Sequence, residues 1–165
     1  MKKYKRELVI DYLALNEFFS LTTEKAFEIL ENELSKVSIT DVWNDDNSQF
    51  LVELLKHQYL GVSNNFLEST LKFSTTQKNF SIVGNENVLI KCQCCGYKTI
   101  ESFGDYDICP VCFWEDDTTS TDDHYSDVNK MTLGEAKKNF QLFGASSKRR
   151  LQFIDKYGKE KYLKE

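Results

Sequence analysis

Five cysteines lie within twenty-one residues of this chain, in an arrangement that suits a metal ion. Cys92 and Cys95 form one C-x-x-C pair, and Cys109 and Cys112 form a second pair, separated from the first by thirteen residues. Two such pairs are typical of structural zinc sites, in which four thiolates surround the metal at about 2.3 Å. The spacing therefore predicts that these four cysteines bind zinc and that zinc holds this part of the chain together.

The remaining cysteine, Cys94, is not required by a site with four ligands. We expect it to be a small thiol beside the ligands or on the surface, so that Cys94→Ser should cost little zinc. Substitution of Cys94 for Cys92 as a ligand, and a redox role, are the alternatives. Gly96 and Pro110 lie where the two pairs must turn, which favours paired metal-binding turns.

A closed site of four cysteines argues against catalysis. Catalytic zinc keeps an open position for water, so we expect this chain not to be an enzyme. His124 could replace a cysteine or prime a water as an alternative. His57 has no nucleophile or carboxylate partner nearby in the sequence.

An acidic stretch follows the second cysteine pair. The simplest explanation is that these charges belong to a solvated loop. The functional hypothesis is that they form a surface that attracts a basic partner protein. Calcium binding is a third alternative. The candidate partner-binding residues are Glu115, Asp116, Asp117, Asp122, Asp123 and Asp127.

Basic residues gather near the end of the chain, which keeps nucleic-acid binding by a zinc ribbon as an alternative function. The formal net charge of −5 argues against it, because phosphate binding depends on Lys and Arg. The residues concerned are Lys148, Arg149, Arg150, Lys156, Lys159, Lys161 and Lys164.

No apolar run reaches the roughly 20 residues that span a bilayer, and Asp11, Asn16 and Glu17 interrupt what would be a signal peptide. We therefore expect a cytoplasmic protein with no membrane partner. In a reducing compartment, clustered cysteines bind metals more often than they form disulfides.

The elements that must position the cysteines differ between the two halves of the chain. Residues 1–80 predict a helical lobe, with helices that end near Gly61 and Phe73. Its apolar stripes are expected to form the core, with a partner groove as the alternative. The first stripe is Leu8, Tyr12, Leu15 and Phe19; the second is Phe27, Leu30, Leu34 and Val37, after an N-cap at Thr22 or Thr23.

Residues 74–87 are polar and rich in turn formers, and they predict a boundary between the lobe and a second domain at 88–165. Residues 87–91 and 97–103 predict the two strands of a hairpin around the first cysteine pair. Thr132 and Glu135 form a capping box that predicts a helix ending at Gly144. A further helix is expected from Ser146 or Ser147, with Leu151, Ile154 and Tyr157 turned inward.

Three stretches, "CQCCGYKTI", "GDYDICPVCFWEDD" and "NKMTLGEAKKNFQLFGAS", resemble the bacterial cysteine-rich CPCC domain family over residues 90–150. Gln93 replaces the proline of the family's motif. The resemblance implies a zinc-ribbon-like module without an established enzymatic activity. It also implies a place beside polymorphic toxins, where small acidic proteins act as immunity factors.

Together these observations predict an α+β protein with an N-terminal helical lobe and a C-terminal zinc-ribbon-like hairpin module followed by one or two helices. The predicted function is binding and neutralising a cognate toxin, itself expected to be basic.

Overall fold

The computed structural model describes residues 1–74 and 79–165, and it confirms the α+β class. The chain divides into two compact units: the first is Met1–Leu60 with Leu67–Asn85, and the second is Gly61–Phe66 with Glu86–Glu165. Part of the predicted boundary, residues 75–78, lies outside the described residues. No described helix is long and apolar enough to cross a membrane.

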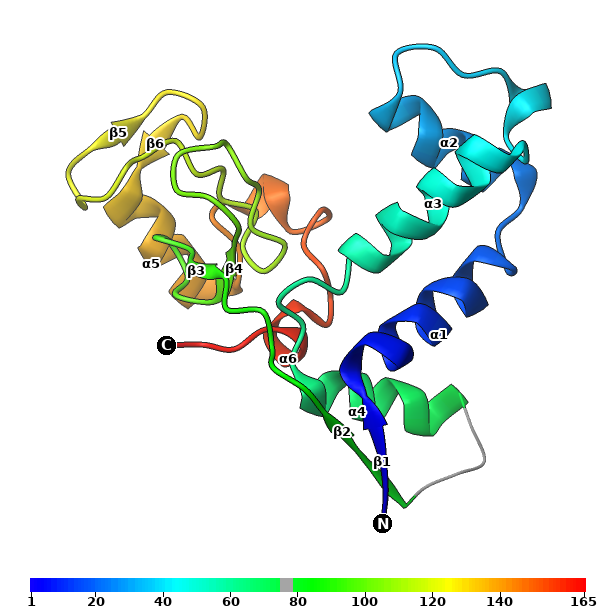
Figure 1. The fold of residues 1–165 in the computed structure, drawn as a ribbon. Coiled ribbons are helices and arrows are strands. Elements are labelled where there is room, and N and C mark those ends of the chain that lie inside the picture. The colour runs from blue at the N-terminus through cyan, green and yellow to red at the C-terminus, as the bar shows by residue number, and fades with distance from the viewer. Residues whose placement is uncertain (75–78) are drawn as a thin grey trace. The chain divides into compact units, whose positions relative to one another are not determined.

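The first unit is mainly helical (Figure 1). One cluster of its core consists of four fully buried residues from the segment 23–57: Ala26, Leu30, Val42 and Leu51. The unit contains β1 (Lys2–Lys5), α1 (Arg6–Phe18), α2 (Thr23–Glu33), the short 3-10 helix η1 (Ile39–Asp41), α3 (Asp45–His57), most of α4 (Asn64–Ser74) and β2 (Phe80–Val83).

The predicted core face of α1 is wrong. Leu8, Tyr12, Leu15 and Phe19 are exposed, and Val9, Leu13 and Ala14 are buried instead. Helix α1 lies against α3, and apolar residues occupy more than one of its faces. Periodicity alone could not decide between those faces, because each has helical spacing.

The caps of the following helices agree with the sequence. The hydroxyl of Thr22 accepts a hydrogen bond from the backbone N–H of Lys25 (3.3 Å) at the start of α2, as one of the two predicted N-caps. Leu30 is buried, while Phe27, Leu34 and Val37 pack half-buried around the core. Helix α4 ends within a residue of the predicted Phe73.

The sequence did not predict the two-stranded sheet of this unit. Strand β1 pairs in parallel with β2, and Lys2 lies opposite Phe80. The rings of Tyr4 and Phe80 meet edge to face at 5.4 Å. Strand β2 lies in the segment that was expected to be only a turn-rich boundary. Because parallel pairing joins residues that are far apart in the sequence, no local sequence pattern predicts it.

The second unit holds the cysteines, and its strands are short. Strands β3 (Ile90–Lys91) and β4 (Lys98–Ile100) form the predicted antiparallel hairpin around the first cysteine pair. A second hairpin, β5 (Tyr125–Ser126) and β6 (Met131–Thr132), was not predicted; β5 lies at the end of the acidic stretch and β6 follows it.

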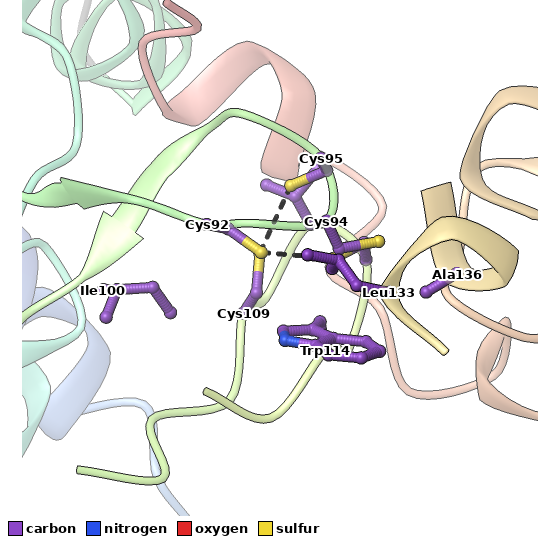
Figure 2. Packing of buried hydrophobic residues seen from close by; sticks show 10 residues of the cluster. Cys92, Cys94, Cys95, Ile100, Cys109, Trp114, Leu133 and Ala136 are labelled. Carbon is purple, nitrogen blue, oxygen red and sulfur yellow. Dashed lines mark hydrogen bonds between the residues drawn. The ribbon is translucent and has the colours of Figure 1, made fainter. Parts of the chain in front are cut away.

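Helix α5 (Leu133–Phe143) has the predicted ends. Thr132 and Glu135 form the complete capping box, and Gly144 ends the helix in the left-handed conformation at φ 90°. Leu133 and Ala136 are buried against the cysteines. The helix therefore supplies one wall of the core that surrounds the cysteine cluster (Figure 2).

The helix expected from Ser146 or Ser147 is wrong. The chain forms the short 3-10 helix η2 (Lys148–Arg150), then turns, and becomes helical again only in α6 (Gly158–Lys161). Leu151 and Tyr157 are exposed. Backbone hydrogen bonds to the turn that contains Cys109 and Cys112 hold this segment in place of helical ones. One of them runs from the N–H of Asp155 to the carbonyl of Pro110 (2.8 Å).

Candidate metal centre

The two cysteine pairs form two turns with the same hydrogen bonds, which we call knuckles. In the first, Cys92 N–H donates to the Tyr97 carbonyl (2.8 Å) and Gly96 N–H donates to the Cys92 carbonyl (2.9 Å). In the second, the N–H of Cys109 donates to the carbonyl of Trp114 (2.9 Å), and the N–H of Phe113 donates to the carbonyl of Cys109 (2.7 Å). Each turn directs its two cysteine side chains to the same side.

The residue after the second cysteine of each knuckle has a positive φ: 77° at Gly96 and 61° at Phe113. Glycine adopts this conformation without strain, whereas a side chain raises its energy by about 1–2 kcal/mol. Contacts of the Phe113 ring offset part of this cost: its centroid lies 5.2 Å from that of the tilted ring of Phe153 and 5.8 Å from the guanidinium of Arg150.

The knuckles bring the four paired cysteines together. Their sulfur atoms all lie within 4.8 Å of one another, and all four side chains are buried. The sulfurs of Cys92 and Cys112 are 3.6 Å apart, as are those of Cys95 and Cys109. These separations are too long for disulfide bonds, and all the cysteines are free. The four cysteines are thus positioned for metal binding.

The thiols of the cluster differ in acidity. Burial opposes ionisation of Cys109, but hydrogen bonds from Cys112, Cys92 and Cys95 hold its pKa well below the ordinary value. The hydroxyl of Thr99 also donates to the sulfur of Cys109 (3.1 Å). Hydrogen bonding to Cys109 and burial raise the pKa of Cys92, whereas burial is the main cause for Cys112. A divalent metal would displace the remaining protons, as thiolate ligation requires.

Cys94 is buried with the other cysteines but is not one of the four converging sulfurs. Figure 2 shows its sulfur on the side of the cluster that faces α5. Two open hollows of about 480 and 410 Å³ adjoin it. Four lysines line one or both of them: Lys91, Lys137, Lys159 and Lys164. Lys91 and Lys137 form ion pairs with Glu165 and Asp122. The ammonium groups of Lys159 and Lys164 would therefore be the ones to offset the negative charge of four thiolates around a divalent ion.

Trp114 forms the floor of the core beneath the cysteines, as Figure 2 shows, and has no exposed surface. Its indole N–H finds no hydrogen-bond acceptor among the described residues. Trp114 directly follows the second cysteine pair in the sequence motif, but no pattern of residues predicted its role in the core. Thr99 was also missed, because a lone threonine in a short strand carries no ligand-like pattern.

The acidic stretch does not form one charged surface. Asp116 is buried at 1 % exposure, and its carboxylate accepts a hydrogen bond from Gly104 N–H (2.7 Å). Burial raises the pKa of Asp116 above its ordinary value. Asp122 forms an ion pair with Lys137 (2.6 Å). Asp123 and Asp127 are exposed, and Glu115 and Asp117 are half-buried.

We expect Asp116→Ala to destabilise the second unit by about 1–3 kcal/mol, because the N–H of Gly104 would lose its acceptor. Denaturant unfolding of the metal-loaded protein measures this loss. Asp123→Ala is the matched control and should change stability by less than about 0.5 kcal/mol, since its side chain is exposed. Equal losses in the two variants would show that Asp116 has no special structural role.

The basic residues near the end of the chain are partly used inside the second unit. The guanidinium Nη1 of Arg150 donates to the carbonyl of Phe113 (3.0 Å), to Oδ1 of Asn129 (2.6 Å) and to the hydroxyl of Ser146 (3.2 Å). Lys159 lies 5.2 Å from the ring of Phe140. Arg150 therefore ties the second knuckle to the segment after α5 and is not a free contact for a phosphate backbone.

The histidines take no part in the cluster. His124 is exposed in the acidic stretch, and His57 ends α3 in the first unit. Over residues 1–74 and 79–165, the four cysteines are the only histidine, cysteine and carboxylate residues that converge as a potential metal site. The acidic residues thus do not converge in the way that the calcium alternative requires.

The second unit is a cysteine-rich module built around a metal-binding cluster. Residues 90–161 match the model of a family described as Cysteine-rich CPCC, which supports the resemblance seen in the sequence for this segment. No curated protein and no solved structure matched the chain.

Proposed function

We propose that this chain is a zinc-binding immunity protein that binds and neutralises a cognate bacterial toxin. The observation that carries the proposal is the closed, buried cluster of four cysteine sulfurs. It favours a structural metal in a module made for binding another molecule. The match to the Cysteine-rich CPCC family supports the same kind of module.

Zinc is the metal that these ligands fit best. A tetrahedron with zinc–sulfur distances of about 2.3 Å places its sulfurs about 3.8 Å apart. Two of the sulfur pairs here are 3.6 Å apart and all four sulfurs lie within 4.8 Å of one another, so small shifts of the side chains would admit the ion. Bound zinc would cross-link the two knuckles, and four thiolates would leave it no open position for a water or a substrate.

The toxin-binding role is supported by charge. The formal net charge is −5, and four thiolates with one divalent ion would make it about −7. Electrostatic complementarity speeds association with a basic partner and favours it over other proteins. Within the acidic stretch, the side chains that remain available for such a contact are chiefly the exposed Asp123 and Asp127.

Co-expression with the product of the adjacent gene tests this function. We expect the two proteins to co-purify and this chain to restore the growth of cells that carry the toxin. Asp123→Lys with Asp127→Lys should weaken the complex if the acidic stretch contacts the toxin. Glu31→Lys with Glu33→Lys makes the same change in charge at exposed sites of the first unit and serves as the control. Absence of both co-purification and protection with every neighbouring product would exclude the immunity function.

A further inference from the structure

The last eight residues of the chain, Gly158–Glu165, lie along the first knuckle, and we call them the C-terminal strap. The N–H of Lys98 donates to the carbonyl of Leu163 (2.9 Å), and the N–H of Glu165 donates to the carbonyl of Gly96 (3.2 Å). The strap is therefore hydrogen-bonded to the backbone of the turn that carries the first two candidate metal ligands.

Two lysines of the strap lie on aromatic rings that pack against the cysteines. The Nζ atom of Lys164 is 5.3 Å from the ring centroid of Tyr97, and that of Lys159 is 5.2 Å from the ring centroid of Phe140. The two rings meet edge to face at 6.4 Å, and both pack against the buried cysteine core. All four side chains line the hollow of about 410 Å³ that Cys95 also lines. Cation–π contacts thus hold both ammonium groups beside the cluster.

No carboxylate neutralises these two ammonium groups among the described residues. Lys159 and Lys164 form no ion pair there, and no carboxylate lines this hollow. The third lysine of the lining, Lys137, is already in an ion pair. Within the strap itself, Glu165 is paired with Lys91 (2.9 Å). The two ammonium groups therefore lack a local counter-charge apart from the cysteine cluster.

The cysteine cluster supplies charge of the opposite sign. Four thiolates around one divalent ion carry a net charge of about −2, whereas an empty cluster of protonated thiols carries none. Two ammonium groups therefore stabilise the loaded cluster more than the empty one. The same thiolate charge repels an external oxyanion, so the cluster itself is the favoured counter-charge for the two lysines.

We infer that the C-terminal strap retains the metal by placing Lys159 and Lys164 against the charge of the four thiolates. This inference rests on the zinc site of the proposed function, and it adds the element that controls how fast the metal is lost. Side chains that surround the ligands of a metal site commonly change metal affinity by about 10–100-fold when they are replaced.

Transfer of zinc from the loaded protein to a colour-forming chelator tests the inference. Lys159→Gln with Lys164→Gln should release zinc about tenfold faster or more. The difference should shrink at high salt, because salt screens charge at exposed side chains. Lys159→Arg with Lys164→Arg keeps both charges and their contacts with the rings, so it should release zinc at the rate of the unmodified protein.

The matched control is Lys148→Gln with Lys156→Gln. It makes the same change in net charge at exposed sites of the second unit, and Lys156 also lies on a ring, 4.7 Å from the centroid of Tyr157. Neither residue lines the hollow, so the control should release zinc like the unmodified protein. Unchanged release from the Lys159, Lys164 glutamine variant, or equal acceleration in that variant and the control, would overturn the inference.

Two further measurements give separate outcomes. Sulfate, compared with chloride at the same ionic strength, should leave release from the unmodified protein unchanged. A sulfate effect that the glutamine variant lacks would assign the two lysines to an external oxyanion, and the inference would be wrong.

Metal analysis before the transfer distinguishes the strap from the zinc site. About one zinc per chain in every variant, with equal release rates, would contradict the role of the strap alone. An unmodified protein without zinc would contradict the site on which the inference rests. Because no toxin enters these measurements, failure to neutralise a toxin would count against the proposed function and not against the strap.

Discussion

Replacing Cys109 with serine is expected to reduce bound zinc from about one ion per chain to a small fraction of that amount. The sulfur of Cys109 lies within the cluster, 3.6 Å from that of Cys95, and it accepts a hydrogen bond from the hydroxyl of Thr99. Structural zinc contributes about 10–16 kcal/mol of apparent binding free energy in zinc-finger peptides. Loss of the ion should therefore unfold the second unit. Metal analysis after gel filtration and limited proteolysis measure the two effects.

Cys94→Ser is the control for this experiment. Cys94 is buried in the same core but lies outside the four converging sulfurs, so this variant should keep its zinc and its resistance to protease. Equal zinc loss in both variants would mean that Cys94 is also a ligand. Full zinc content in Cys109→Ser would contradict the assignment of the site.

Trp114→Ala should produce the next largest effect, a loss of about 3–5 kcal/mol in the free energy of unfolding. The side chain has no exposed surface and packs in the same core as the cysteines, Leu133 and Ala136. Its removal would leave a large cavity next to the metal site. Denaturant unfolding of the zinc-loaded protein, followed by far-ultraviolet circular dichroism, measures the loss.

Two further variants separate packing from polarity. Trp114→Phe keeps a ring in the core and removes an indole N–H that has no acceptor among the described residues, so it should lose less than the alanine variant. Trp43→Ala, at a site 42 % exposed in the first unit, should cost about 1 kcal/mol. Equal losses for Trp114→Ala and Trp43→Ala would show that Trp114 does not support the core.

The candidate metal centre was largely predictable because its determinants are local. A C-x-x-C pair forms its turn within a few residues, and each knuckle is flanked by its own short antiparallel pairing. The ends of α5 were predictable for the same reason, since a capping box and a left-handed glycine act within one helical turn.

Contacts between distant residues were not predictable in this way. The parallel pairing of β1 with β2 leaves no local pattern, and neither do the hydrogen bonds that join Arg150 to Phe113 and Asn129. Arg150, which makes these last contacts, lies in the segment after Ser146 where a helix was expected. The propensity of a short segment is a weak preference, which tertiary contacts of this strength override.

By itself the sequence determined the α+β class, the paired cysteines, the caps of α2 and α5, and the surplus of acidic residues, because each depends on neighbouring residues or on composition. Only the tertiary structure decided which apolar face of α1 is buried and which acidic residues are available. Leu8 and Val9 have similar hydrophobicity, and Asp116 and Asp123 carry the same charge, yet one of each pair is buried and the other is exposed. The physical reason is that burial is set by what packs against a residue, and that neighbour comes from elsewhere in the chain.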